Sequence, residues 1–271
     1  MKLSHSVKKL SDYDDLYKFY FLAESQICTN SYGCKVDTLM RKNVIDWLIQ
    51  KHHEQKLNSE TLYLSINILD RFLSKTDFEV TTQSKFELIG LTSLLLASKY
   101  EQKSAVGVYD IEYMADYSFT PDEICEMEKL ILKKLNWILS VPTPYVFLVR
   151  NIGSCPLSDE DRIIENLASF FSELSLTQYS IVCDYKPSMI AAAAMYCARV
   201  LVGRYPFWNA DLMISARYSE QMLWPCVKVM MELCNETCKD GTMEVFKKFS
   251  SLYRSRVSCI AQEILEQTFL S

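Results

Sequence analysis

Glycine and proline are scarce in this sequence, with only 6 glycines and 7 prolines among 271 residues. All-β folds and glycine-rich phosphate-binding loops depend on these residues for their turns, so the scarcity argues against both classes. Long apolar runs are missing too. No run reaches the roughly 18 residues that span a bilayer, and the first 15 residues contain no apolar stretch of signal-peptide length. We therefore expect a soluble, intracellular protein with no membrane partner.

The sequence also lacks a large excess of charge of one sign. Lys and Arg number 29 and Asp and Glu number 34, which gives a net charge of -5. Proteins that bind nucleic acid normally carry a clustered basic excess, so we expect no nucleic-acid partner. The chain has only 3 histidines, and its 10 cysteines form no C-x-x-C pair. We therefore expect reduced, buried thiols, no metal site and no cofactor.

Sequence patterns typical of enzymes are absent as well. We find no nucleophile elbow, no P-loop and no H-E-x-x-H motif, and the HHE segment at residues 52–54 lacks the i, i+4 histidines of a metal-binding helix. A helical enzyme is therefore the weaker interpretation, and we expect no intrinsic catalytic activity.

The chain is rich in apolar residues that recur with a period near 3.6, which is typical of amphipathic helices. Hydrophobic residues make up 49% of the sequence. We predict helices over residues 12–26, 38–54, 59–74, 82–102, 108–117, 120–135, 143–151, 158–176, 186–202, 218–237 and 244–266. The predicted fold class is all-α.

Two prolines in VPTPYVF, residues 141–147, interrupt the helical pattern and divide the chain. Each half contains about five helices, and the third helix of each half, FELIGLTSLLLASKY or PSMIAAAAMYCARVLV, is the least polar. A helix that is apolar on all sides must be covered on all sides. We predict two tandem five-helix domains over residues 38–140 and 141–271, an additional N-terminal helix and linker over residues 1–37, and a C-terminal helical tail.

The segment MRKNVIDWLIQ, which begins at Met40, is apolar around more of its circumference than a surface helix requires. One stripe holds Met40, Val44 and Trp47, and Arg41 lies among aliphatic residues in a second stripe. In the next predicted helix, Asp70 also borders the core. Because an unpaired buried charge is costly, we predict a structural ion pair between Arg41 and Asp70. The alternative is that both side chains reach solvent.

Several ordered segments carry a resemblance to a known family. MRKNVIDWLI, LNSETLYLSINILDRFLS, KFELIGLTSLLLASKYE and MEKLILKKLNW resemble the cyclin box in the order and spacing found in mitotic cyclins. YDDLYKFYFLAES is similar to the helix that precedes the first box. VPTPYVFLVR, YKPSMIAAAAMYCAR and KFSSLYRS resemble the second box of B-type, plant-like cyclins. The resemblance extends from about residue 12 to residue 258 and implies two cyclin-fold domains.

The resemblance implies a regulatory subunit, not an enzyme: it would bind and activate a cyclin-dependent serine/threonine protein kinase and control cell-cycle progression at G2/M. Cyclins push the kinase αC helix inward, which completes the Lys–Glu ion pair that catalysis requires. Lys99 and Glu128 match the residues that hydrogen-bond to the kinase; the alternative for them is a surface ion pair. The other matching kinase-binding positions are Leu16, Phe19, Tyr100, Glu101, Ile131, Leu132 and Leu139. For the aliphatic positions the alternative is core burial.

The resemblance also implies a substrate-docking groove. Its matching positions are Met40, Val44, Trp47, Gln50, Phe86 and Glu87, and its ligands would be substrates or inhibitors with a short basic-x-Leu motif. The alternative is burial of this stripe under the N-terminal segment. Asn43 replaces the usual aliphatic residue, and QKSAVGV after Glu101 lacks one acid and both prolines of the family pattern. We expect these differences to alter groove affinity and kinase choice.

The resemblance implies a location in the nucleus and cytoplasm. No R-x-x-L destruction box is visible near the start of the sequence, so we expect either that a leader has been removed or that degradation is controlled in another way. The alternative function is that of a transcription-associated cyclin-fold protein, either a regulator of a transcriptional kinase or a general transcription factor. The latter would need basic faces for phosphate contacts and usually a zinc ribbon.

Overall fold

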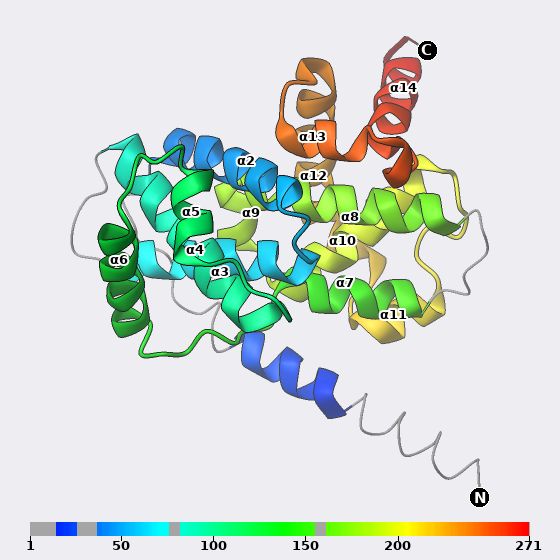
Figure 1. Ribbon diagram of the computed structural model, residues 1–271. Helices are drawn as coiled ribbons and strands as arrows, with labels where there is room; N and C mark the ends of the chain where they lie inside the picture. The colour runs from blue at the N-terminus through cyan, green and yellow to red at the C-terminus, as the bar shows by residue number, and fades with distance from the viewer. Residues whose placement is uncertain (1–14, 26–36, 76–81, 155–160, 271) are drawn as a thin grey trace, which may run out of the picture.

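The computed structural model describes residues 15–25, 37–75, 82–154 and 161–270, and all regular elements in these ranges are helical, which confirms the predicted all-α class (Figure 1). An N-terminal helix over residues 15–25 is followed by α2 (Thr38–Glu54), α3 (Ser59–Lys75), α4 (Gln83–Glu101), α5 (Val108–Met114), α6 (Pro121–Lys134), α7 (Pro144–Gly153), α8 (Asp161–Thr177), α9 (Tyr179–Asp184), α10 (Pro187–Leu201), α11 (Ala210–Ala216), α12 (Glu220–Asp240), α13 (Glu244–Phe249), the short 3₁₀ helix η1 (Leu252–Arg254) and α14 (Val257–Leu270). Within the described ranges, no helix is long and apolar enough to span a bilayer.

The first bundle consists of α2 to α6 and is organised around α4, which packs against each of the other four helices. The side chain of Thr82 caps the start of α4 by accepting the N–H of Lys85. Gly90 lies where α2 crosses closely, because a Cβ there would be only 3.1 Å from side-chain atoms of Val44 and Leu48. The apolar residues on all sides of the segment FELIGLTSLLLASKY predicted that this helix would be the central one.

The second bundle is built in the same way around α10. This helix packs against α7, α8, α11 and α12, and its run from Ala191 to Ala194 is fully buried. Alanines lack the bulk that keeps helices apart, so α7 and α8 can approach α10 closely. Pro187 occupies the first turn, where its missing N–H costs no hydrogen bond.

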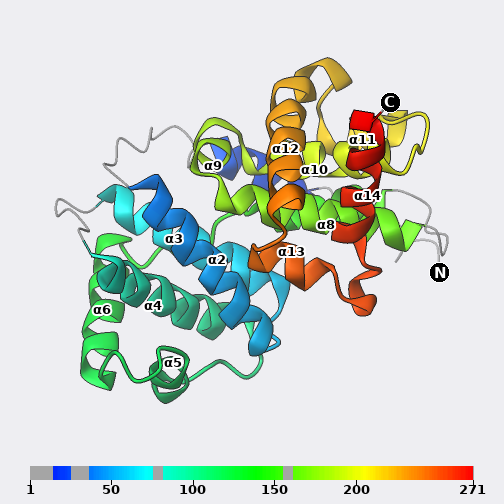
Figure 2. The same cartoon turned by 90° about the horizontal axis from the view of Figure 1, so that it is seen from above.

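The two bundles pack directly against each other, and α13 returns from the second bundle to cover α2 of the first (Figure 2). Asp46 on α2 accepts the N–H of Glu244 at the start of α13, at 2.9 Å. Nζ of Lys248 lies 2.6 and 2.9 Å from the carboxylate oxygens of Glu173 on α8, and both side chains are buried. A capped helix end and a buried ion pair therefore fix α13 between α2 and α8.

The prediction of a single helix over residues 244–266 is wrong. The chain forms α13, η1 and α14 there, and Ser255 and Arg256 both have positive φ, 56° and 51°, which turns the backbone between the elements. The short helices α9 and α11 were not predicted, because six or seven residues are too few to show a clear period. The predicted helix starts at residues 12 and 158 lie outside the described residues.

Candidate functional site

The end of α4 and the middle of α6 bring one lysine and one glutamate together at the surface. Nζ of Lys99 lies 2.5 Å from Oε1 of Glu128, and the two side chains are 44% and 16% exposed. An exposed pair of this kind contributes little to stability. The ammonium has three donors and the carboxylate about four acceptor positions, so most of their hydrogen-bonding capacity stays available for another molecule.

The start of α6 is fixed by its own sequence, and this start sets the position of Glu128. Thr120 is the N-cap, Pro121 is the first helical residue, and the Thr120 and Glu123 side chains cap each other's backbone N–H groups. The hydrogen bonds from the backbone and hydroxyl of Thr120 lower the pKa of the Glu123 carboxyl. This capping box defines where the helix begins and hence which face of α6 carries Glu128.

Apolar side chains flank the Lys99–Glu128 pair. Tyr100 is exposed, and the predicted residues Leu132 and Leu139 are half-buried. Glu101 is half-buried, and burial, followed by the charge of Glu60, raises the pKa of its carboxyl. Tyr100 and Glu101 follow Lys99 directly and Leu132 lies about one turn after Glu128, and the part of all four residues in kinase binding stays a prediction.

The turn after α6 presents two further apolar side chains that sequence reasoning missed. Trp137 is 74% exposed and Ile138 is 60% exposed. Trp137 has a φ of 62°, a conformation that is unfavourable for a bulky residue. The Arg71 guanidinium donates to the Ile138 carbonyl at 2.6 Å and to the Leu139 carbonyl at 3.5 Å, which fixes this turn. An exposed tryptophan on a strained, immobilised turn is typical of a binding site.

One predicted kinase-binding residue needs correction. Ile131 is fully buried, and it belongs to the core of the first bundle. It lies about one turn from Glu128 on α6 but is part of the core, so it does not belong to the surface around the pair. Core and interface aliphatics share the same composition, and the sequence could not separate them.

The N-terminal helix contributes a separate apolar surface. Leu16 and Phe19, both predicted kinase-binding residues, are exposed at 43% and 63%, and Leu22 continues the same stripe. Tyr17 and Glu24 on the opposite face are buried. The helix is thus attached by one face and presents apolar side chains on the other.

The predicted docking groove is only partly a surface feature. Met40, Trp47, Gln50 and Glu87 are half-buried and Asn43 is exposed. The Gln50 amide donates to Glu54 at 2.8 Å, and the Gln83 amide donates to Glu87 at 3.1 Å, so both polar positions are engaged within their own helices.

Val44 and Phe86 were also predicted to line this groove, and this prediction is wrong for the present structure. Both are buried, at 0% and 1% exposure. The close helix crossing at Gly90 brings Val44 against α4, and neither side chain belongs to the accessible surface.

Arg41 and Asp70 form a buried, bidentate ion pair. Nε and Nη2 of Arg41 each lie 2.7 Å from one carboxylate oxygen of Asp70. Nη1 donates to the carbonyl of Leu176 at 3.0 Å and reaches that of Thr177 at 3.4 Å. The pair therefore joins α2 and α3 to the end of α8 in the second bundle.

Metal-binding and disulfide chemistry find no support in the part of the chain that the structure describes. It contains no group of three or more His, Cys, Asp or Glu side chains that could hold a metal ion. The described cysteines are free thiols: Cys125, Cys183, Cys197, Cys226, Cys234, Cys238 and Cys259. Cys234 and Cys238 share a face of α12 with their sulfurs 3.9 Å apart, and both are buried.

Comparison with known families decides the assignment. The family model of the cyclin N-terminal domain matches residues 15–140, and that of the cyclin C-terminal domain matches residues 142–263. The chain belongs to the cyclin family. The two matched ranges cover both helical bundles, so the cyclin fold accounts for nearly all of the described structure.

The relatives of this cyclin include mitotic proteins from plants. It is 38% identical over 256 residues to the G2/mitotic-specific cyclin-2 of Antirrhinum majus, and this match covers 93% of the chain and 57% of the relative. It is 37% identical to the G2/mitotic-specific cyclin S13-7 of Glycine max, with 91% and 94% covered, and 36% identical to Cyclin-B1-4 of Arabidopsis thaliana, with 91% and 63% covered. The chain spans a little over half the length of several of these relatives.

A solved structure shows the same fold. The X-ray structure of a viral cyclin from herpesvirus saimiri matches this cyclin with a TM-score of 0.69 over 80% of this chain and 95% of the viral chain. The sequence identity is 21%, so this likeness concerns the fold alone.

Proposed function

We propose that this cyclin is the regulatory subunit of a cyclin-dependent serine/threonine protein kinase, which it binds and activates at G2/M. Membership of the cyclin family and the G2/mitotic-specific names of its relatives support this proposal. The observation on which it chiefly rests is the exposed Lys99–Glu128 pair, with the exposed Tyr100 next to Lys99 and the exposed Trp137 in the turn after the helix that carries Glu128.

The physical basis is a shift of a kinase equilibrium. A protein kinase is active only when its αC helix is held inward so that the catalytic Lys–Glu pair forms. A partner that contacts only the inward position of αC shifts the population toward it by its differential binding energy. Trp137 and Tyr100 offer apolar contact area, and Lys99 and Glu128 offer hydrogen bonds that fix the register of such a helix.

Reconstitution tests this proposal. The purified cyclin is mixed with a purified cyclin-dependent kinase, and phosphorylation of a histone substrate is measured. We expect activity only when both proteins are present, because the cyclin contributes position and no chemistry. Activity from the cyclin alone, or no stimulation of any cyclin-dependent kinase tested, would contradict the proposed role.

We also propose that the α2 surface around Met40 and Trp47 docks substrates or inhibitors that carry a basic-x-Leu motif. The supporting observation is that these two large apolar side chains are only half-buried on a rigid helix. A fluorescent peptide with this motif should bind the wild type and bind Trp47→Ala at least about tenfold more weakly. Equal binding by both proteins would refute the groove.

For its cellular location, we propose the nucleus and cytoplasm, in keeping with the mitotic role. Imaging of the tagged, full-length protein through the cell cycle tests this: a signal confined to a membrane-bounded organelle other than the nucleus would contradict it.

A further inference from the structure

The N-terminal helix is attached to the second bundle, although the Lys99–Glu128 pair lies on the first. The hydroxyl of Tyr17 donates to the carbonyl of Val146 on α7 at 3.0 Å. The ring of Phe21 lies 5.0 Å from that of Phe147, and the guanidinium of Arg217 lies over Phe21 at 4.3 Å. These contacts bind one face of the helix to α7 and to the turn after α11.

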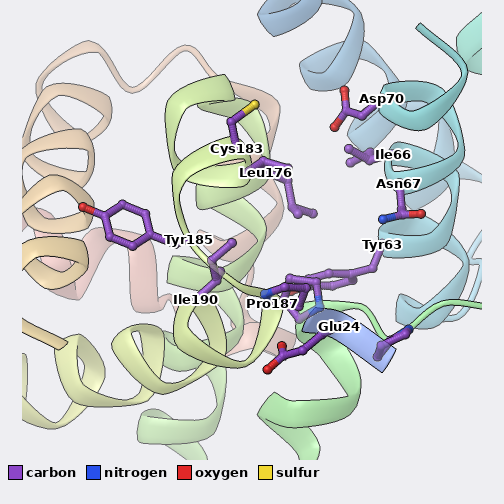
Figure 3. A pocket seen from close by; sticks show the side chains of 13 residues that line it. Glu24, Tyr63, Ile66, Asn67, Asp70, Leu176, Cys183, Tyr185, Pro187 and Ile190 are labelled. Atoms are coloured by element: carbon purple, nitrogen blue, oxygen red, sulfur yellow. The ribbon is translucent and has the colours of Figure 1, made fainter. Parts of the chain in front are cut away.

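Glu24, at the end of this helix, is the one acidic residue of its described part that is buried, at 2% exposure. Its carboxylate accepts the N–H of Ser188 at 3.0 Å and the Ser188 hydroxyl at 2.6 Å. The Ser188 hydroxyl lies 2.7 Å from that of Tyr218. A cavity lies between the N-terminal helix, α3 and the start of α10, and Glu24 and Pro187 both line it (Figure 3).

These hydrogen bonds give the buried polar groups of both Glu24 and Ser188 a partner. Ser188 is in the first turn of α10, where backbone N–H groups have no partner within the helix and a negative charge is favoured. The carboxylate supplies the missing acceptor. Truncation of Glu24 would leave the buried N–H and hydroxyl of Ser188 without it, and that loss is expensive inside a protein.

We propose that Glu24 is a positioning residue: by bonding to the start of α10 it fixes the N-terminal helix on the second bundle, and so sets the place at which Leu16 and Phe19 meet the kinase. This inference rests on the proposed function. Leu16 and Phe19 are exposed and lie roughly one and a half to two turns before Glu24, too far along the helix for direct contact, so Glu24 acts through the orientation of the helix.

Hydrogen exchange of the free cyclin tests the attachment without a kinase. In Glu24→Ala, the amides of residues 17–25 should exchange at least about tenfold faster, while those of α4 keep their protection, which shows that the fold is intact. Glu24→Gln keeps an acceptor and should stay within about twofold of the wild type. Asp15→Asn is the matched control, because Asp15 pairs with Lys18 on the exposed face. Unchanged exchange in Glu24→Ala would overturn the proposal.

The pH profile separates a specific carboxyl contact from mere packing. Burial raises the pKa of Glu24, while the Ser188 bonds and the nearby Lys186 act in the opposite direction. The attached state therefore binds the proton more tightly than the detached state, so attachment strengthens as the pH falls through the raised pKa toward the ordinary value of 4.5. Protection factors of residues 17–25 should rise in the wild type relative to Glu24→Gln as the pH is lowered toward 4.5. Parallel profiles would overturn the role of the carboxyl group.

Three other titratable side chains, Tyr63, Cys183 and Tyr185, line the cavity beside Glu24, and burial raises the pKa of each above its ordinary value of 9 or 10. Lys186 and Ser188 belong to the start of α10, and Tyr218 follows α11. On the α3 side, Asp70 lines the same cavity but is paired with Arg41 in both variants. The difference between wild type and Glu24→Gln therefore isolates the titration of Glu24.

A double-mutant cycle then tests the link to the kinase. Glu24→Ala should weaken kinase binding about tenfold in the wild-type background and less than about twofold in a Leu16→Ala/Phe19→Ala background, because the helix then lacks the two side chains that are proposed to meet the kinase. A full tenfold loss in both backgrounds would contradict the proposal. If the wild type binds no kinase, the proposed function fails, and the exchange experiment still decides whether Glu24 holds the helix.

Discussion

Arg41 is fully buried, and every nitrogen of its guanidinium is engaged by Asp70 or by backbone carbonyls at the end of α8. Burial of the charged group is tolerated because its partners are supplied by α3 and by the second bundle. The pair therefore joins α2, α3 and α8, and its loss should lower the stability of both bundles.

Asp70→Ala should lower the free energy of unfolding by about 3–5 kcal/mol, because it leaves the Arg41 charge buried without its counter-ion. Urea denaturation followed by circular dichroism measures the change. Asp15→Ala is the control, since the Asp15–Lys18 pair is exposed and should contribute less than about 1 kcal/mol. Equal losses in the two variants would show that Arg41 finds other compensation.

His52 predicts a pH dependence of stability. Burial lowers the pKa of its imidazole from 6.5 to about 4, and its Nε2 lies 2.8 Å from the carbonyl of Asn58. The unfolded chain takes up the proton first, so stability is lost as the pH falls from 6.5 toward 4, by up to about 3 kcal/mol. Unfolding free energies of wild type and His52→Gln over this range should converge at acid pH. Parallel curves would refute the assignment.

Positions on the helical wheel were sufficient to predict the Arg41–Asp70 pair from the sequence. Arg41 and Asp70 each border an apolar stripe, and their pairing follows from the cost of a lone buried charge. Sequence reasoning failed for Val44, Phe86 and Ile131, because a residue at an interface and a residue beneath it look the same in sequence. Their burial is decided by helix crossings that only the packed structure defines.

At the scale of the elements, the start of α6 controls the surface that carries Glu128. Thr120→Ala removes the N-cap side chain and should cost about 1 kcal/mol of stability. It should also weaken kinase binding modestly, since the first turn of α6 frays. Ser219→Ala is the matched control, because Ser219 occupies the N-cap of α12 without a side-chain capping bond. An equal effect of both substitutions on stability would contradict this role of the capping box.

The docking of α13 offers a second test at this scale. Lys248→Met leaves Glu173 buried and unpaired and should cost about 3–5 kcal/mol, with faster hydrogen exchange in α13. Replacing both partners, Lys248→Met/Glu173→Leu, should restore most of this stability because no lone charge remains. A double variant as unstable as Lys248→Met would show that the ion pair itself, and not the uncompensated charge, determines the stability.

The long helices were predictable, whereas the short helices α9 and α11 were not. The residue ranges of α2, α3 and α4 follow from caps and a sustained period. The segment between Phe249 and Val257 contains neither glycine nor proline, so nothing in the sequence signalled the end of α13 or the start of α14. The contacts of Glu24, Asp46 and Glu173 span 75 to 198 residues in sequence, and such tertiary contacts cannot be read from local periodicity.

At the scale of the whole molecule, the residues proposed to bind the kinase are divided between the two bundles. The first bundle carries Lys99, Glu128 and Trp137, and the second holds the helix that carries Leu16 and Phe19. The ion pair at Arg41 and the docked α13 fix one bundle against the other. This rigidity matters because a partner can be held in one conformation only by contacts that are themselves fixed in place.

The measurement that tests the central claim most directly is calorimetric titration of a cyclin-dependent kinase with the wild type and with Lys99→Ala/Glu128→Ala. We predict binding by the wild type and an affinity lower by about a hundredfold in the double variant, because both hydrogen-bonding groups are lost at the interface. Lys228→Ala/Glu232→Ala, which removes an exposed pair on α12, should leave the affinity unchanged. Equal affinity of the wild type and the Lys99→Ala/Glu128→Ala variant would contradict the account.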